Sequence, residues 1–124
     1  MYELTVERSF SAAHCLRDYD GPCARMHGHN YRVEITVQGP ELDEQGMLVD
    51  FGPLKGLCDE VLGELDHRLL NELPAFAERN VTSENLAVHI YRGVAARLDP
   101  RLKMAHVRLW ETGGSSVTYR EESQ

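Results

Sequence analysis

Residues 27–38 read HGHNYRVEITVQ, and the alternation in this stretch decides the fold class of the chain. The odd-numbered positions carry histidine and apolar side chains: His27, His29, Tyr31, Val33, Ile35 and Val37. From residue 32 the even-numbered positions are polar: Arg32, Glu34, Thr36 and Gln38. Because successive side chains of a strand point to opposite faces, the pattern predicts a strand with one buried face. His27 and His29 share that face, so they could converge on one metal ion.

A second alternating stretch lies upstream, at residues 2–10, with its apolar side chains at even positions. It predicts a half-buried antiparallel strand. The same parity continues through Ala12 to His14, which places His14 on the inner face if the chain stays extended that far. Three neutral imidazoles with an open fourth position are typical of a catalytic zinc site. The alternative is that one or more of these are ordinary core or surface histidines, and three imidazoles also suit other first-row ions.

The rest of the chain alternates between helical and strand patterns. After a turn at 40–46, Asp50 and Pro53 mark a helix start, and leucines at helical spacing follow as far as Leu69. Thr82 or Ser83 is the expected N-cap of a second helix, whose apolar stripe runs to residue 98. Strands are expected at 103–111 and around 117–119, joined by a turn at 113–114. The pattern predicts an α+β fold, two strand pairs separated by two helices, in a single domain spanning 1–124.

Composition narrows the class of protein. The chain has 124 residues, 42% hydrophobic side chains and a formal net charge of −7. Such a charge argues against nucleic acid as a partner, because phosphate binding needs a basic face. No apolar run approaches the ~18 residues of a membrane span, and no secretory signal is visible, so we expect no membrane partner and a cytoplasmic location. Three cysteines, an odd number, argue against a disulfide framework.

Further side chains could carry chemistry. Cys23 lies four residues before His27 and could be a loop cysteine, a fourth metal ligand or a thiolate base. Asp66 and His67, near the expected end of the first helix, could be a dipole-stabilising pair or an acid–base pair. Glu111 falls on the inner parity of its strand, where a carboxylate needs a partner. Cys15 and Cys58 are expected to be filler, and His89 and His106, on polar faces, have no assigned role.

Taken together, these motifs resemble the 6-pyruvoyl-tetrahydropterin synthase family. The matching pieces are SAAH (11–14), CARMHGHNY (23–31), VDF (49–51) with LK (54–55), LDH (65–67), TSEN (82–85) and WET (110–112). They occur in family order and cover nearly the whole chain. The resemblance implies a tunnelling fold, a four-stranded antiparallel sheet with two helices on one face. Three subunits would close a barrel, and two trimers would stack into a homohexamer with active sites at subunit interfaces.

The resemblance also implies roles for individual residues. His14, His27 and His29 would hold one Zn²⁺ per subunit, Cys23 would be the general base, and Asp66 with His67 would relay protons. Glu111 would accept the N–H groups of the pterin. The pterin pocket would also be lined by residues at the start of the second helix: Thr82, Ser83 and Glu84.

The expected substrate is 7,8-dihydroneopterin 3'-triphosphate, and two products are possible within the family. The short spacing between Cys23 and His27 resembles the bacterial branch, which forms 6-carboxy-5,6,7,8-tetrahydropterin with release of acetaldehyde and triphosphate for queuosine (7-deazaguanine) biosynthesis. Asn30 and Tyr31 resemble the pyruvoyl-forming branch, which eliminates triphosphate without carbon–carbon cleavage. We favour the carboxy-forming lyase because the loop positions the base. A non-catalytic pterin- or zinc-binding module is the third alternative. Arg17 and Arg25 are nearby cations expected to be solvated.

Overall fold

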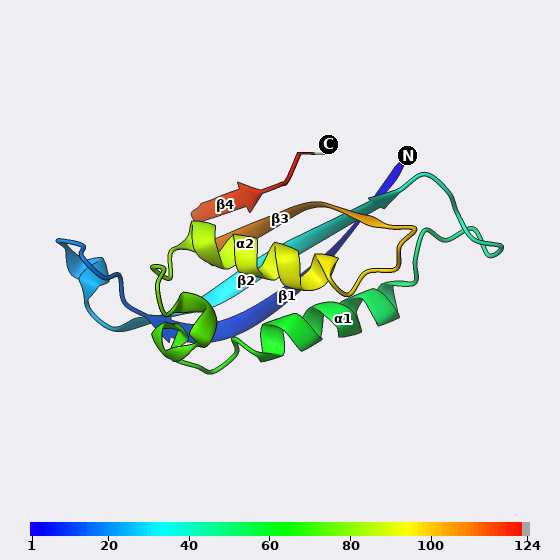
Figure 1. The fold of residues 1–124 in the computed structure, drawn as a ribbon. Helices are drawn as coiled ribbons and strands as arrows, with labels where there is room; N and C mark the ends of the chain where they lie inside the picture. The colour runs from blue at the N-terminus through cyan, green and yellow to red at the C-terminus, as the bar shows by residue number, and fades with distance from the viewer. Residues whose placement is uncertain (123–124) are drawn as a thin grey trace.

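The computed structural model describes residues 1–122, which form one antiparallel sheet and two helices (Figure 1). Three short 3-10 turns interrupt the loops. The strands are β1 (Tyr2–His14), β2 (His27–Gly39), β3 (Lys103–Thr112) and β4 (Ser115–Tyr119), and the helices are α1 (Phe51–Gly63) and α2 (Ser83–Ala95). Both helices lie on the same face of the sheet, as Figure 1 shows. The predicted α+β architecture is therefore confirmed. Within residues 1–122, no helix is long and apolar enough to cross a membrane.

The sheet has the strand order β1-β2-β3-β4, with every pair antiparallel. β1 and β2 pair without interruption, from Tyr2 opposite Gly39 to His14 opposite His27. Because an antiparallel pair without a bulge sets inner positions of one strand opposite inner positions of the other, the inner face of β1 continues into the inner face of β2. The register therefore carries both histidine-bearing strand ends to the same corner of the sheet.

The hydrophobic core lies between the sheet and the two helices. From β2 it receives Val33, Ile35 and Val37, each fully buried, as the alternation predicted. From α1 it receives Leu54, Cys58, Val61 and Leu62, and from α2 Leu86, Ala87, Ile90, Tyr91 and Val94. The two helices approach closely at Gly93, where a Cβ atom would lie 2.9 Å from Cγ1 of Val61. A larger side chain at this position would force α2 away from α1.

Both helices end earlier than the apolar spacing suggests. α1 ends at Gly63, although the leucine pattern continues to Leu69, and α2 ends at Ala95, although its stripe runs to Leu98. Leu65 and Leu70 are fully buried, so the turn after α1 still covers the core without being helical. His67 has a φ of 58°, which a right-handed helix cannot contain. The expectation that Asp66 and His67 belong to the first helix is therefore wrong.

Two irregularities modify the predicted alternation of β3. Thr36 pairs with His106 and Val37 pairs with Met104, so Ala105 has no partner on β2, and Met104 is buried in its place. Near the other end of β3 the pairing with β4 shifts between Trp110 and Thr112, which leaves Glu111 as the extra residue. Bulges of this kind re-aim a side chain and occur often beside functional sites.

Candidate metal centre and catalytic residues

Four side chains from three strands converge at one corner of the sheet. His14 comes from the end of β1, His27 and His29 from the start of β2, and Glu111 from the irregular part of β3. One possible ligand atom from each of the four lies within 4.8 Å of the others. His14 is buried and the other three are half-buried. The uninterrupted β1–β2 register causes this meeting, because it sets His14 directly opposite His27.

Main-chain carbonyls orient two of the three imidazoles. Nδ1 of His14 lies 2.7 Å from the Val81 carbonyl oxygen, and Nδ1 of His27 lies 2.6 Å from that of Arg25. A carbonyl only accepts, so Nδ1 carries the proton in both rings and Nε2 presents a lone pair. Partners of this kind orient metal-ligating histidines in general. They predispose Nε2 of each ring to bind a cation.

The Nε2 atoms of His14 and His29 are buried and have no hydrogen-bond partner among residues 1–122. Oε1 of Glu111 lies 2.8 Å from Nε2 of His29 and 3.7 Å from Nε2 of His14, without hydrogen-bond geometry to either. A carboxylate oxygen this close to an imidazole nitrogen is favourable only when a proton or a cation lies between them. The donor set therefore fits a divalent ion, with three imidazole nitrogens and a carboxylate within reach.

Burial favours the neutral form of His14 and His29, which is the form that binds metals. Desolvation lowers the pKa of both His14 and His29 below the ordinary value, and the neighbouring His27 lowers both further, while Glu111 opposes the shift. Desolvation likewise lowers the pKa of His89, which is half-buried against Phe76 with a ring separation of 5.5 Å. The expectation that His89 lies on a polar face is therefore wrong.

These shifts predict how stability depends on pH. A histidine with a lowered folded pKa takes up its proton more readily in the unfolded chain, so its contribution to stability is present above pH 6.5 and is lost as the pH falls. We expect the free energy of unfolding of the metal-free protein, measured by urea denaturation, to fall between pH 8 and pH 5.5. Metal affinity should fall in the same direction, because protons compete for Nε2. A free energy that stayed constant or rose on acidification would contradict the assignment.

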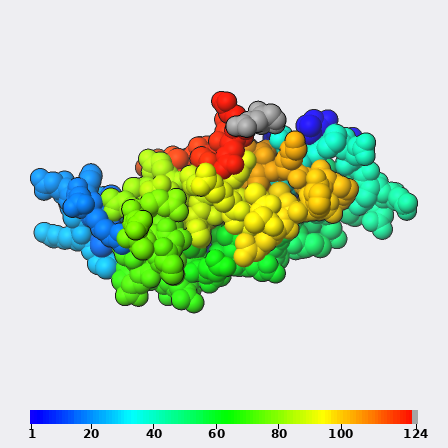
Figure 2. All heavy atoms as spheres, in the orientation of Figure 1, coloured from blue at the N-terminus to red at the C-terminus, as the bar shows by residue number. Residues whose placement is uncertain are grey.

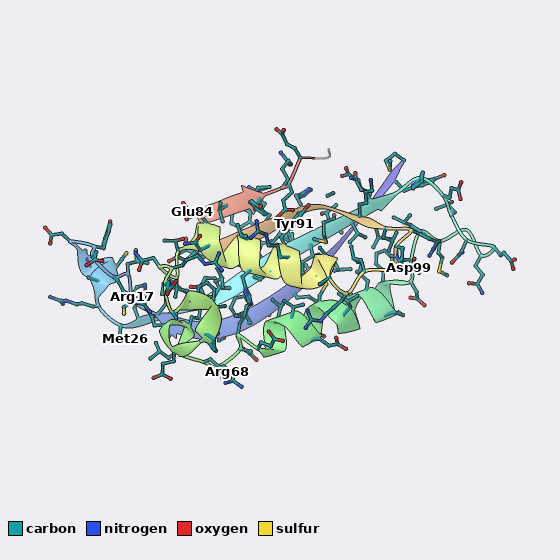
Figure 3. The ribbon with its side chains drawn as sticks, in the orientation of Figure 1. Arg17, Met26, Arg68, Glu84, Tyr91 and Asp99 are labelled. Atoms are coloured by element: carbon teal, nitrogen blue, oxygen red, sulfur yellow. The ribbon has the colours of Figure 1, made fainter. Side chains whose placement is uncertain are left out.

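Glu111 is held from its other side by α2. Its Oε2 accepts a hydrogen bond from the hydroxyl of Ser83, the first residue of the helix, and Thr82 caps that helix by accepting from the backbone N–H of Asn85 at 3.1 Å. The structure therefore brings the start of α2 to Glu111. Glu84 is exposed at the start of α2 (Figure 3).

Cys23 lies apart from this group. It belongs to a 3-10 turn, Pro22–Ala24, in the loop between β1 and β2, and this loop projects beyond the sheet at the left of Figures 1 and 2. The thiol is half-buried and is not one of the four converging side chains. Cys58 differs, since it packs in the core, where burial raises the pKa of its thiol to about 11. Of the two, only Cys23 is placed where a thiol could react with a dissolved molecule.

Asp66 and His67 lie in the turn after α1, against the backbone of β1. Oδ1 of Asp66 accepts from the N–H of Ser11 at 2.9 Å and lies 3.0 Å from Nδ1 of His67, and the N–H of His67 donates to the Ser11 carbonyl at 2.6 Å. The Ser11 bond, followed by the His67 contact, lowers the pKa of Asp66. The His67 side chain is 82% exposed. It lines a hollow of about 480 Å³ together with His29 and Gly28, so the pair faces the same opening as one of the metal-site histidines.

The structure adds residues that the sequence analysis did not assign. The carbonyls of Val81 and Arg25 have no sequence signal, because any residue type supplies a carbonyl. The sequence did indicate Tyr31, because it occupies the same face of β2 as His29. Its ring lies 5.4 Å from that of His29. Arg17 is not the solvated cation expected, because its guanidinium donates to the carbonyls of Asn71 and Ala77.

Tyr31 provides a direct test of packing beside the site. Its ring stacks on Phe10 at 4.8 Å, and burial raises the pKa of its phenol, whose oxygen has no hydrogen-bond partner in the described part of the chain. Leaving a buried hydroxyl unsatisfied is unfavourable, so Tyr31→Phe should leave the free energy of unfolding unchanged or raise it by up to about 1 kcal/mol. Urea denaturation measures this, with Tyr119→Phe as a matched control that removes an exposed hydroxyl bonded to Glu121. A loss above about 1 kcal/mol would show that the Tyr31 hydroxyl has a partner.

The chain has an antiparallel sheet with two helices on one face and a histidine group at the corner of β1 and β2. This architecture places it among the proteins of the tunnelling fold, or T-fold. Residues 3–122 match the family described as 6-pyruvoyl tetrahydropterin synthase, and the chain belongs to that family.

Some relatives are named as carboxy-forming synthases and others as pyruvoyl-forming synthases. The chain is 42% identical to the 6-carboxy-5,6,7,8-tetrahydropterin synthase of Bacillus subtilis (strain 168), over 96% of this chain and 85% of the relative. It is 37% identical to the 6-pyruvoyl tetrahydrobiopterin synthase of Poecilia reticulata, over 96% and 90%. Among solved structures, the 6-pyruvoyl tetrahydropterin synthase of Caenorhabditis elegans is 32% identical, with a TM-score of 0.84 and 98% of each chain covered.

Proposed function

We propose that this protein is a metal-dependent lyase that converts 7,8-dihydroneopterin 3'-triphosphate and water into 6-carboxy-5,6,7,8-tetrahydropterin, acetaldehyde and triphosphate, within queuosine biosynthesis. The observation that carries the proposal is the group of His14, His27, His29 and Glu111 in a chain that is 42% identical to a synthase of that name. The alternative, triphosphate elimination to a pyruvoyl product, is supported by the 37% identical relative and by Asn30 and Tyr31. The short spacing between Cys23 and His27 favours the carboxy-forming reaction.

The metal in this proposal is zinc, one ion per subunit, held by His14, His27 and His29. When bound, such an ion acts as a Lewis acid that acidifies the side-chain hydroxyls of the substrate. The carbonyls of Val81 and Arg25 keep Nε2 of two ligands free of protons. Glu111, which accepts a hydrogen bond from Ser83, is proposed to accept the paired N–H groups of the pterin. Thr82 and Glu84 are proposed to line the same pocket.

Proton transfer is assigned to Cys23, Asp66 and His67. In its thiolate form Cys23 would remove the proton from the substrate carbon next to the ring, and His67, with its tautomer set by Asp66, would pass protons through the hollow that His29 also lines. The electron pair left on that carbon enters the ring system as it tautomerises, and triphosphate departs with the electrons of its carbon–oxygen bond. Water then adds to the side-chain carbon next to the ring, and the bond from that carbon to the next one breaks. The departing carbon takes up a proton to leave as acetaldehyde, and the carbon that stays becomes the 6-carboxyl group.

The positions of Cys23, His67 and the edge strands support an enzyme assembled from several subunits. Within one chain the Cys23 loop projects beyond the sheet, and His67, in the turn after α1, has a side chain that is 82% exposed. The open sheet also leaves β1 and β4 as edge strands, which proteins normally cover or pair. We therefore propose a homohexamer, a dimer of trimers, in which neighbouring subunits complete each active site.

Product identification tests the proposal. Purified protein with zinc is incubated with 7,8-dihydroneopterin triphosphate, the pterin product is identified by mass spectrometry, and acetaldehyde is assayed. The proposal expects a 6-carboxy pterin and one acetaldehyde per triphosphate released. A diketo pterin without acetaldehyde would establish the pyruvoyl-forming alternative. Bound metal with no turnover of any pterin would establish a non-catalytic binding module.

A further inference from the structure

Two asparagine side chains pair with the backbone of the segment that leads into the Cys23 loop. Oδ1 of Asn71 accepts from the N–H of Cys15 at 2.9 Å, and its Nδ2 donates to the Cys15 carbonyl at 3.0 Å. Asn80 does the same with Arg17, at 2.7 and 3.0 Å. Each side-chain amide thus satisfies both main-chain groups of one residue, as a neighbouring strand would.

The opposite side of the same segment holds Cys23 itself. Backbone groups of successive extended residues point to alternate sides, so Cys15 and Arg17 share one side and Leu16 uses the other. The N–H of Leu16 donates to the Cys23 carbonyl at 2.8 Å. Residues 15–17 are therefore bonded to the two asparagines on one side and to the turn bearing the thiol on the other.

The segment that supplies Asn80 also supports the metal site. The next residue, Val81, presents the carbonyl that accepts from Nδ1 of His14, and the Asn80 carbonyl accepts from Nδ2 of Asn85 in α2 at 3.0 Å. Arg17 adds contacts from its guanidinium to the carbonyls of Asn71 and Ala77, and Figure 3 shows it at the base of the projecting loop. One short stretch of chain therefore positions both a metal-site imidazole and the Cys23 loop.

We propose that Asn71 and Asn80 are positioning residues that hold the Cys23 thiol at a set distance from the histidine group. The proposal rests on the proposed role of Cys23 as the base. The amides hold the loop through its backbone, so they touch neither metal nor substrate. Their effect is on the placement of the base, and a base displaced by about 1 Å loses about a hundredfold in rate.

The test compares Asn80→Leu and Asn71→Leu, which remove both bonds, with Asn80→Asp, which keeps the acceptor for the Arg17 N–H and removes only the donor. Asp59→Ala is the matched control, because it also removes two hydrogen bonds, to Arg8 at 2.8 Å, on the outer surface of α1. Turnover of 7,8-dihydroneopterin triphosphate, iodoacetamide labelling and amide hydrogen exchange are measured on the zinc-loaded protein. Trypsin places Cys15, Cys23 and Cys58 in separate peptides, 9–17, 18–25 and 56–68, so labelling of each is read independently.

We expect the two leucine variants to lower kcat about a hundredfold while KM changes less than about threefold, with Asn80→Asp in between. Labelling of Cys23 should become several-fold faster, amides of 18–25 should exchange faster, and bound zinc should stay at the wild-type level. Variants that behave like Asp59→Ala in both kcat and labelling would overturn the proposal, as would faster labelling with an unchanged kcat. If the wild-type protein itself forms no product, the proposed function fails, and unchanged labelling and exchange rates in the leucine variants would then overturn the inference separately.

Discussion

Replacing His29 with alanine is expected to lower kcat by at least about 10³-fold and to reduce bound zinc to a small fraction of one ion per chain. The first effect follows from losing several kcal/mol of transition-state stabilisation, at 1.36 kcal/mol per factor of ten. The second follows because a ring nitrogen of His29 is one of four possible ligand atoms within 4.8 Å of each other, and two imidazoles hold zinc far more weakly than three. Metal analysis of the purified protein and product formation measure the two effects.

The matched control for this variant is His106→Ala. His106 pairs with Thr36 across the sheet and lies outside the converging group, so zinc content and kcat should stay close to wild type. Circular dichroism checks that both variants fold. A His29→Ala protein that kept its zinc and its turnover would show that the four side chains are not the catalytic metal site.

Replacing Cys23 with alanine is expected to lower kcat by about 10²- to 10⁴-fold, the usual contribution of a general base, with zinc content and KM nearly unchanged. We expect kcat to fall without a loss of zinc because Cys23 lies in the projecting loop and is not among the metal-site side chains. Steady-state kinetics and metal analysis measure the two quantities.

Cys15→Ser serves as the control, since it changes the other cysteine near this loop and keeps the backbone groups that Asn71 binds. It should retain most of the wild-type kcat. Full turnover by Cys23→Ala would assign the base to another group, and the exposed His67 would be the next candidate.

The histidine corner could be predicted because it depends on parity alone. His14, His27 and His29 occupy inner positions of two strands, and an uninterrupted antiparallel register brings inner positions of the strand ends together. The same reasoning placed Val33 in the core, where it is fully buried. Local rules therefore sufficed for β1, for β2 and for the helix start at Asp50. They left Thr82 or Ser83 as the N-cap of α2, and the structure shows that it is Thr82.

The ends of the helices and the bulges of β3 could not be predicted in the same way. Leucine spacing continues beyond α1 because the turn that follows also covers the core, and periodicity does not distinguish a helix from a turn that packs on the same surface. Parity did place Glu111 on the inner face of β3, where it joins the histidines. No local pattern marks it as the extra residue in the pairing with β4, because that bulge depends on the partner strand.

The sequence by itself determined the α+β order, the inner faces of β1 and β2 and the three histidines on them, because these follow from periodicity within a few residues. The tertiary structure decided how those histidines are oriented and what else joins them. The carbonyl of Val81 fixes the tautomer of His14, and the amides of Asn71 and Asn80 hold the Cys23 loop. These contacts join residues more than fifty positions apart, so they exist only once the core has brought the segments together.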